Sequence, residues 1–151
     1  MGIQEVLSTF VHGVYIIGAK EGDNINGMTA AWVCQCSFSP KMVAVAIAPE
    51  RFTYELIERS GKFSVSLLRD GQIELAKRFG EVSGRDKNKF SDVDYSLIED
   101  VPVLTDCLCW VVCELDGKLK SGDHYIITGR VLKSKQVRLG SPLIFRWEDY
   151  F

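Results

Sequence analysis

The sequence has no long hydrophobic run and no excess of charge of either sign. Its longest apolar run, Met42–Ala48, covers seven residues, whereas a membrane-spanning helix needs about 20. Lysine and arginine number 18, and aspartate and glutamate 20, which disfavours a nucleic-acid binder because such a protein needs a basic face. The first residues also lack the basic start and apolar core of a signal peptide. We therefore expect a cytoplasmic protein with no membrane span and no nucleic-acid partner.

Cysteine is present at five positions, an odd number that cannot pair fully. This count also favours a reducing compartment. Cys34 and Cys36 are two residues apart, and Cys107, Cys109 and Cys113 fall on one later strand. A metal or redox site is one interpretation, but zinc ligands usually lie at turns with a wider spacing. We favour the other interpretation, that these cysteines are small buried hydrophobic residues.

Length and composition predict one domain over residues 1–151, because 46% hydrophobic and 25% charged residues are typical of a globular chain. Alternation and turn residues predict strands, short helices and a turn-rich stretch. The strands are 13–19, 28–38, 42–48, 63–68, 107–115, 125–132 and 142–147; the helices are 3–10, 53–60 and 71–79, the last two ended by Gly61 and Gly80; the turn-rich stretch is 21–27. This pattern indicates a mainly β fold, a closed and mostly antiparallel barrel with helical lids.

Familiar nucleotide and hydrolase motifs are missing, namely GxGxxG after a strand, the P-loop and GxSxG. Two segments nevertheless suit an anion. Thr53 is a plausible N-cap with Arg51 beside it, and a helix start attracts negative charge. The segment Ser83–Phe90 adds three basic residues in five positions. Each segment has an ordinary alternative, a capped helix and a solvated loop, so together they are a hypothesis of a phosphate site.

Two further segments are candidates for contacts with a ligand. In Asn26–Trp32 the small residues at 29–31 allow a planar ligand to approach the backbone, and Trp32 either covers a ring or lies in the core. His124 lies near the tip of a predicted hairpin, where loops often carry function. It either steers a substrate or is structural, whereas His12 near a strand start is more simply structural.

Four segments in this order resemble the flavin reductase-like family, the FMN-binding split barrels, over nearly the whole chain. They are N26-G-M-T-A-A-W32; E50-R-F-T-Y-E-L-I57 with S60-G-K-F-S-V-S-L67; F79-G with S83-G-R-D-K-N-K-F90; and G122-D-H-Y-I-I-T-G-R-V131. Within the family the chain resembles flavoredoxin and the flavin-reductase domain of high-molecular-weight rubredoxin. The resemblance implies a Greek-key split β-barrel and a homodimer with one FMN per subunit.

The resemblance also implies a role for individual residues. Asn26 and Thr29, Ala30, Ala31 and Trp32 would line the isoalloxazine ring and ribityl chain. Arg51, Thr53 and Lys89 would hold the phosphate, with Ser37, Ala48 and Arg85 as further cofactor-binding positions. His124 would lie near the reactive face, where the nicotinamide of NADH or NADPH arrives, and the segment from Trp147 to Phe151 would close over the ring. Ala31 stands where many members carry Ser or Asn, so some contacts to the flavin would come from the backbone alone.

Three functions fit these expectations. The first is an NAD(P)H-dependent flavin reductase, and the second a flavoredoxin-type carrier that passes electrons between redox proteins such as rubredoxin or ferredoxin. The third is a split barrel that binds another ligand such as haem, which the phosphate-site candidates disfavour. A flavin supplies its own hydride chemistry, so the lack of a convincing catalytic dyad is compatible with the first two.

Overall fold

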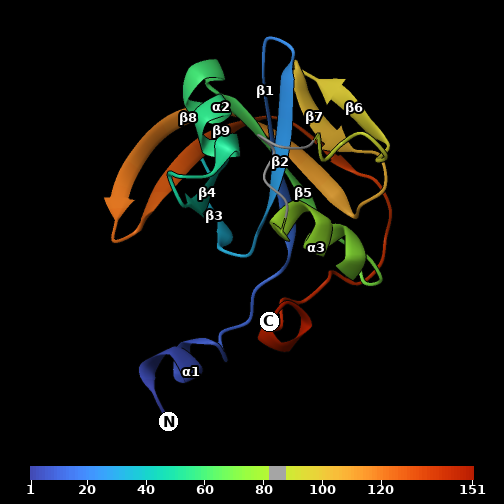
Figure 1. The fold of residues 1–151 in the computed structure, drawn as a ribbon. Coiled ribbons are helices and arrows are strands. Elements are labelled where there is room, and N and C mark those ends of the chain that lie inside the picture. Colours follow the sequence, from blue (N-terminus) through green and yellow to red (C-terminus); the bar gives the residue numbers. More distant parts are fainter. Residues whose placement is uncertain (82–87) are drawn as a thin grey trace.

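The computed structural model describes residues 1–81 and 88–151 and is mainly β (Figure 1). The helices of the described chain are α1 (Ile3–Leu7), α2 (Phe52–Ser60), α3 (Ile73–Glu81) and a 3-10 turn, η1 (Trp147–Asp149). The strands are β1 (Tyr15–Glu21), β2 (Asn24–Ala30), β3 (Val33–Ser37), β4 (Met42–Ile47), β5 (Lys62–Leu67), β6 (Tyr95–Ile98), β7 (Val101–Leu104), β8 (Cys109–Ser121) and β9 (His124–Gln136). The predicted fold class, a mainly antiparallel β fold with a few short helices, is confirmed.

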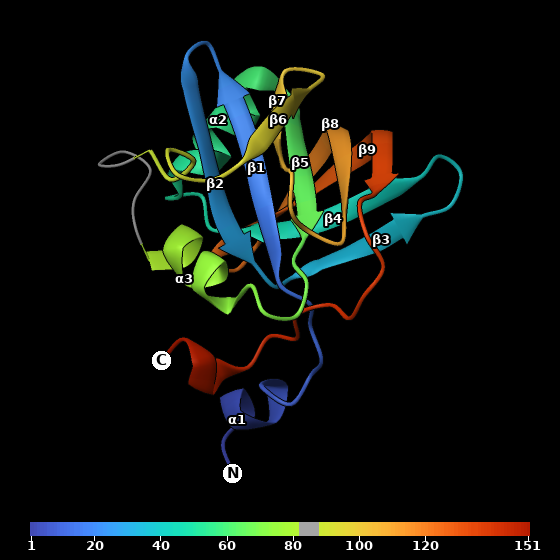
Figure 2. The same cartoon turned by 90° about the vertical axis from the view of Figure 1, so that its right-hand side faces the viewer.

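Seven strands form one strongly curved antiparallel sheet in the order β2-β1-β5-β8-β9-β4-β3, and β6 and β7 form a separate hairpin (Figure 2). The two edge strands, β2 and β3, are consecutive in the chain and are joined by Ala31 and Trp32. The backbone N–H of Ala46 on β4 donates to the carbonyl of Trp32 at 3.0 Å. The sheet therefore curls back on itself at this link, which brings β2, β3 and β4 together at one place.

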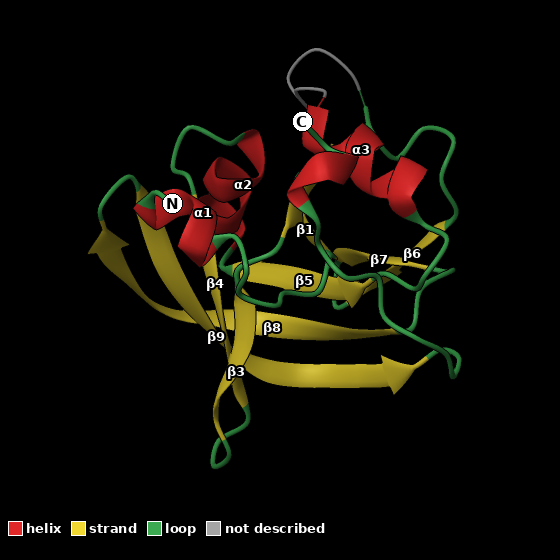
Figure 3. Ribbon diagram, turned by 90° about the horizontal axis from the view of Figure 1, so that it is seen from below, coloured by secondary structure: helices red, strands yellow, loops and turns green. Residues whose placement is uncertain are grey.

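Two hydrophobic clusters hold the helices against the sheet, and β1 contributes to both. Ile16 belongs to the cluster with Phe79 of α3, whereas Ile17 belongs to the cluster with Leu56 and Ile57 of α2. Successive strand side chains point to opposite faces, so β1 is buried on both sides. Seen from below, α2 and α3 flank β1 (Figure 3). This packing fixes the ends of both helices relative to the β2–β3 link.

The strand boundaries differ from the predicted ones where tertiary pairing overrides local turn preference. The stretch 21–27 was predicted as a turn, but only Gly22 and Asp23 turn, and Asn24–Gly27 pairs with β1. The predicted strand 28–38 is interrupted at Ala31 and Trp32. Residues 142–147 form only isolated bridges, at Pro142 and Ile144, because the segment crosses the sheet end rather than running along a strand.

The helix ends also correct the prediction. Arg51, not Thr53, occupies the N-cap of α2, and no side chain caps it. Gly61 ends α2 with φ +74°, the left-handed conformation that suits glycine. Gly80 does not end α3, which continues to Glu81, and Gly80 does not adopt the positive φ of a left-handed helix end.

Four of the five cysteines divide into two groups, and the fifth, Cys109, is half-buried. Cys107 and Cys113 are buried, in agreement with the interpretation as small hydrophobic residues, and burial raises the pKa of each thiol to about 12. Cys34 and Cys36 are exposed, so that interpretation is wrong for them, because β3 is an edge strand. Within residues 1–80 and 88–151 no cluster of side chains is arranged as a metal site.

Candidate functional site

Two adjoining pockets lie where β2, β3 and β4 meet α3 and the C-terminal segment. The first, here the strand pocket, has a volume of about 190 Å³ and is lined by Met28, Thr29, Ala30, Ala31, Trp32, Ala46, Ala48, Arg51, His124, Phe145 and Trp147. The second, the helix pocket, has a volume of about 340 Å³ and is lined by Thr29, Arg51, Ala76, Lys77, Gly80, His124, Phe145, Trp147, Tyr150 and Phe151. They share five residues, so one elongated ligand can occupy both.

The strand pocket is lined by small side chains that expose the backbone. Its four alanines come from the end of β2, the β2–β3 link, β4 and the residue that follows β4. Thr29 ties this wall to α3, because its hydroxyl donates to the carbonyl of Ala76 at 2.5 Å. A flat ring can therefore approach main-chain N–H and C=O groups here, and polar recognition from the backbone does not depend on a side chain at Ala31.

Two cations lie close together at the α2 end of the pockets. Arg51 lines both pockets, and burial lowers its pKa. Lys89 is only 2% exposed, and its Nζ donates to the carbonyls of Gly27 at 3.0 Å and Phe79 at 2.9 Å. Burial, with the charge of Arg51 as a second cause, lowers the pKa of Lys89 to about 8.

No carboxylate of residues 1–80 and 88–151 forms a recorded ion pair with either cation. Buried charges are costly unless they are paired. The two cations therefore create a positive field that a bound anion would neutralise. Lys77, half-buried on α3 and 4.0 Å from Glu74, adds a third cation on the helix pocket.

Asn26 and Thr53 form a buried pair behind the pockets. The Nδ2 of Asn26 donates to the Oγ1 of Thr53 at 2.9 Å, and both residues are at most 2% exposed. The Oδ1 of Asn26 is buried and has no hydrogen-bond partner in the described part of the chain. Neither residue lines the strand or helix pocket, so their visible role is to join β2 to the start of α2.

His124 begins β9, directly after the two-residue turn Gly122–Asp123. Gly122 has φ +61°, which this tight turn needs and glycine supplies without strain. The Nδ1 of His124 lies 2.7 Å from the carboxylate of Asp123, and the imidazole lies against Trp32 with ring centroids 4.9 Å apart. The hydrogen bond to His124 is the main cause that lowers the pKa of Asp123. These contacts hold the imidazole at the edge of both pockets.

The C-terminal segment supplies an aromatic wall. Phe145 stacks on Tyr150, with ring centroids 5.0 Å apart and planes at 10°, and Trp147 contacts Phe151 at 5.0 Å. Phe145 also donates its backbone N–H to the carbonyl of His12 at 2.9 Å. Beyond Phe145 the described backbone hydrogen bonds of this segment are local, within residues 146–151. Aromatic packing therefore holds the last residues over the helix pocket.

The structure brings together eight of the predicted site residues on the two pockets: Thr29, Ala30, Ala31, Trp32, Ala48, Arg51, His124 and Phe151. Asn26, Thr53 and Lys89 lie behind the pocket walls. Ser37 lies apart, five residues along from Trp32 and so roughly 15 Å away at the rise of an extended strand. Arg85 falls outside the described residues.

Lys77 and Phe145 also line the pockets, although the sequence analysis did not select them. The signal for Lys77 was weak, because a lysine on an amphipathic helix is usually a solvated residue. It is flanked on its own helix by the small residues Ala76 and Gly80, which open this face of α3 to the pocket. Phe145 lay in a segment predicted as a strand, where an aromatic residue would ordinarily belong to the core.

The sequence model of the flavin reductase like domain matches residues 7–151, and the chain therefore belongs to this family. The chain is 34% identical over 146 residues to a high molecular weight rubredoxin from Moorella thermoacetica, covering 95% of this chain and 64% of that protein. It is 32% identical over 142 residues to a flavin reductase from Pseudomonas putida, covering 93% and 82%. It also spans 25% and 24% of two diflavin flavoproteins from Nostoc, so several relatives are considerably longer.

Solved structures agree with this assignment. Flavin reductase PheA2 superposes with a TM-score of 0.84 at 28% identity, covering 97% of this chain and 94% of that one. An FMN-binding protein from Thermus thermophilus with bound p-hydroxybenzaldehyde superposes with a TM-score of 0.81 at 28% identity, covering 85% and 73%. Among residues 1–81 and 88–151, no helix combines the length and apolar character needed to cross a membrane.

Proposed function

We propose that this chain binds FMN and acts as an NAD(P)H-dependent flavin reductase, with the electrons passed on to an acceptor. The proposal rests on the two adjoining pockets. Small residues and aromatic side chains line them, and Arg51 gives them a positive charge. A flavin supplies the hydride and electron chemistry, and the protein supplies binding, orientation and the local field.

The residues present fit FMN. The alanine-rich wall suits a flat ring, and Trp147 with Phe145 adds aromatic surface to the same pocket. We assign Arg51 and Lys77 to direct contact with the phosphate, because both line the helix pocket. Lys89 supports them from behind through its charge. Hydrogen bonds to charged groups contribute roughly 1.5–3 kcal/mol each, so a few of them set the affinity.

His124 is assigned to the nicotinamide side of the site. Its ring already borders both pockets and is oriented by Asp123 and Trp32. An imidazole N–H in this place can hold the donor so that its hydride faces the ring. No side chain has to act as acid or base for that step.

A second candidate is an electron carrier with tightly bound FMN. It is favoured by the relation to a longer high molecular weight rubredoxin, in which a related domain occurs within a larger protein. A redox protein such as rubredoxin or ferredoxin would then replace the nicotinamide as donor. For either candidate we propose a homodimer in the cytoplasm.

One experiment separates these possibilities. The purified protein should show flavin absorbance and release FMN, rather than FAD, when it is denatured and chromatographed. Anaerobic NADH or NADPH should then bleach the flavin band. Bleaching only by a reduced small redox protein would favour the carrier, and a protein that contains mainly FAD or ignores added FMN would refute the FMN assignment.

A further inference from the structure

A third pocket lies between the N-terminal region and the aromatic side chains of the proposed flavin site. This N-terminal pocket has a volume of about 230 Å³, and its lining includes Gln4, Phe10, His12, Trp32, Phe145 and Trp147. Helix α1 lies beside the C-terminal turn η1 (Figure 2), so residues from both ends of the chain form the pocket. Trp32, Phe145 and Trp147 also line the strand pocket. The N-terminal pocket therefore adjoins the place proposed for the flavin ring.

The aromatic side chains of this pocket leave much of their surface uncovered. Phe10 is 60% exposed, Trp32 49% and Trp147 37%. Aromatic side chains that converge on one cavity offer ring faces and edges to another flat molecule, and Leu7 adds an apolar side chain from α1. An apolar cavity of roughly 150 Å³ is enough to bind benzene. The N-terminal pocket therefore has room for one substituted ring.

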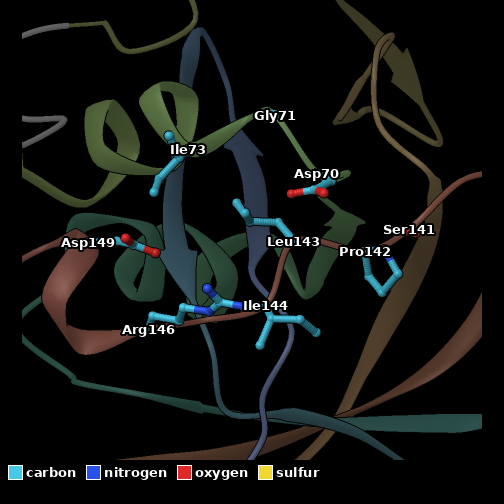
Figure 4. A pocket seen from close by; sticks show the side chains of 9 residues that line it. All are labelled: Asp70, Gly71, Ile73, Ser141, Pro142, Leu143, Ile144, Arg146 and Asp149. Carbon is cyan, nitrogen blue, oxygen red and sulfur yellow. The ribbon is translucent and has the colours of Figure 1, made fainter.

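A second hollow beside the C-terminal turn has a different character. It lies between residues 70–73 and 141–149 and presents the charged groups of Asp70, Arg146 and Asp149 (Figure 4). Its described lining residues include none of those that line the strand or helix pocket. The N-terminal pocket, in contrast, shares three residues with the strand pocket, so it is the better placed of the two for a molecule that reacts with the flavin.

The N-terminal pocket favours a neutral ligand. Among the described residues, no Asp, Glu, Lys or Arg lines it, and burial of a charged group without a partner is costly. The Nε2 of Gln4 donates one hydrogen to the hydroxyl of Ser8 at 3.2 Å. An amide nitrogen carries two hydrogens, so the second is available to an oxygen of the ligand. The lining thus suits a flat, uncharged molecule with a carbonyl oxygen.

This pocket is separate from the place proposed for the nicotinamide. His124 lines the strand and helix pockets but not the N-terminal pocket. Its imidazole instead contacts the other pocket wall at Trp32, with ring centroids 4.9 Å apart. A molecule in the N-terminal pocket would therefore lie against the aromatic residues shared with the flavin and leave His124 free for the donor.

We propose that the N-terminal pocket binds the electron acceptor and that this acceptor is a small neutral quinone, an inference that rests on the proposed reductase function. A quinone is flat and uncharged, carries carbonyl oxygens and accepts two electrons, which matches both the lining of the pocket and its position. In the reaction the quinone gains two electrons and two protons and becomes the hydroquinone. The reduced flavin loses the same number of each and returns to its oxidised form, so no further reactant is needed.

A binding test uses the apoprotein, without flavin or nicotinamide. Duroquinone is the probe, because its methyl groups hinder addition of the exposed thiols of Cys34 and Cys36. It should quench the tryptophan fluorescence saturably, since Trp32 and Trp147 line the pocket. Tetramethylammonium should have no effect. Saturable quenching by tetramethylammonium and not by duroquinone would identify a cation–π site and overturn the proposal.

A matched pair of variants locates the binding. Phe10→Leu removes a ring that lines the N-terminal pocket but neither of the flavin pockets. It should raise the Kd for duroquinone about fivefold, a difference of about 1 kcal/mol. Phe38→Leu is the control, because Phe38 is also exposed and lines none of these three pockets. An unchanged Kd in Phe10→Leu, or equal losses in the two variants, would overturn the proposal.

Steady-state kinetics then separates this inference from the reductase function. With the better of NADH and NADPH as donor, Phe10→Leu should raise KM for duroquinone about fivefold, with little change in kcat. Competitive inhibition of duroquinone reduction by the nicotinamide donor would show that both reactants share one site and would overturn the proposal. Saturable binding of duroquinone without flavin reduction by either donor would support the pocket and refute the reductase. Flavin reduction with no saturable binding of duroquinone, as expected if a second copy of the chain fills the pocket, would refute the pocket alone.

Discussion

At the scale of single residues, the candidate site depends on charges that the protein leaves unpaired. Lys89 is held by two carbonyls and faces Arg51 with no recorded carboxylate partner in residues 1–80 and 88–151. The burial that makes its ammonium costly in the apoprotein also makes it an effective partner for an anion, because screening by water is weak there. The same group therefore limits stability without ligand and supports affinity with it.

Because Lys89 loses its charge within the accessible pH range, we expect FMN binding to depend on pH. Its pKa is about 8 in the unliganded protein, and a bound phosphate stabilises the charged form and raises that pKa. The contribution of Lys89 to FMN affinity should be complete below pH 8 and decline above it, by at most about one decade per pH unit. Fluorescence titration of the apoprotein between pH 7 and 9.5 measures this decline.

Two variants test whether Lys89 causes this pH dependence of FMN binding. Lys89→Met keeps the length of the side chain without its charge, and should bind FMN more weakly and lose the decline above pH 8. Lys135→Met, an exposed lysine on β9, should behave as wild type. An unchanged pH profile in Lys89→Met would remove Lys89 from the site.

In the unliganded protein the contribution of Lys89 to the free energy of unfolding should become more favourable as pH rises, whereas its contribution to FMN affinity declines. The pKa of Lys89 is lowered by folding, so between about pH 8 and 10.5 the unfolded chain binds more protons than the folded one. Stability therefore gains a favourable contribution as pH rises through this window. Urea unfolding of the apoprotein should reveal this gain relative to Lys89→Met, in which it should be absent.

Replacement of His124 should slow flavin reduction by NAD(P)H but not by dithionite. His124→Ala should keep much of the FMN but slow reduction by NAD(P)H about tenfold, the effect of losing roughly 1.4 kcal/mol of orientation. Reduction by dithionite should be unchanged, because this small donor needs no nicotinamide site. Stopped-flow bleaching with both donors measures the two rates, with His12→Ala as the control histidine. Equal NAD(P)H rates in wild type and His124→Ala would make His124 structural.

At the scale of elements, the hairpin of β8 and β9 positions His124. Two of its glycines, Gly129 and Gly117, differ in how closely other atoms pack against them. A Cβ at Gly129 would lie 2.5 Å from Phe63 and 2.7 Å from the Cβ of Cys113, whereas one at Gly117 would lie 3.6 Å from Thr128. Contacts under 3 Å require the packed core to move. Overpacking of this kind costs typically about 1–3 kcal/mol.

Gly129→Ala should therefore lower the free energy of unfolding by about 1–3 kcal/mol, whereas Gly117→Ala should change it by less than about 1 kcal/mol. Urea unfolding of the two variants compares them directly. A similar loss in both would show that backbone conformation, rather than the contact with Phe63, decides the effect.

Much of the fold was predictable because period-two alternation and the residue types of the helices are local signals. The hairpin of β6 and β7 was not predicted. Its turn carries Glu99 and Asp100 at φ +52° and +64°, where glycine or asparagine is usual. Lys20 contacts Asp100 at 2.8 Å and supports this conformation from β1, a long-range contact that no local pattern reveals.

The candidate site was predictable only in part, for a related reason. Thr29–Trp32 and Arg51 are marked by their residue types and by the resemblance. Lys77 reaches the pocket only because α3 packs beside β2, and Asn26 turns away from it to bind Thr53. The direction in which a side chain points depends on packing between elements, so sequence predicts the segment more readily than the contact.

At the scale of the whole molecule, one chain leaves considerable apolar surface uncovered. Helix α1 has no buried residue, and Ile3, Leu7 and Phe10 are exposed in the N-terminal region. A pocket of about 230 Å³ lies between this region and Trp32 with Trp147. Contiguous exposed apolar surface of this kind often marks an interface, and here it adjoins the candidate flavin site.

The proposed homodimer therefore predicts that assembly and FMN binding are linked. Association would cover the apolar residues around the site and restrict the motion of the C-terminal aromatic residues that contact the ring. Ligand binding should therefore favour the dimer. Light scattering over a dilution series should give twice the chain mass in the FMN-bound protein. Flavin fluorescence in the same samples should report release of FMN as the dimer dissociates. The apoprotein should dissociate at a higher protein concentration than the bound form, because FMN that binds only the dimer stabilises it by mass action. A stable monomer that retains FMN would refute the link and place the complete site within one chain.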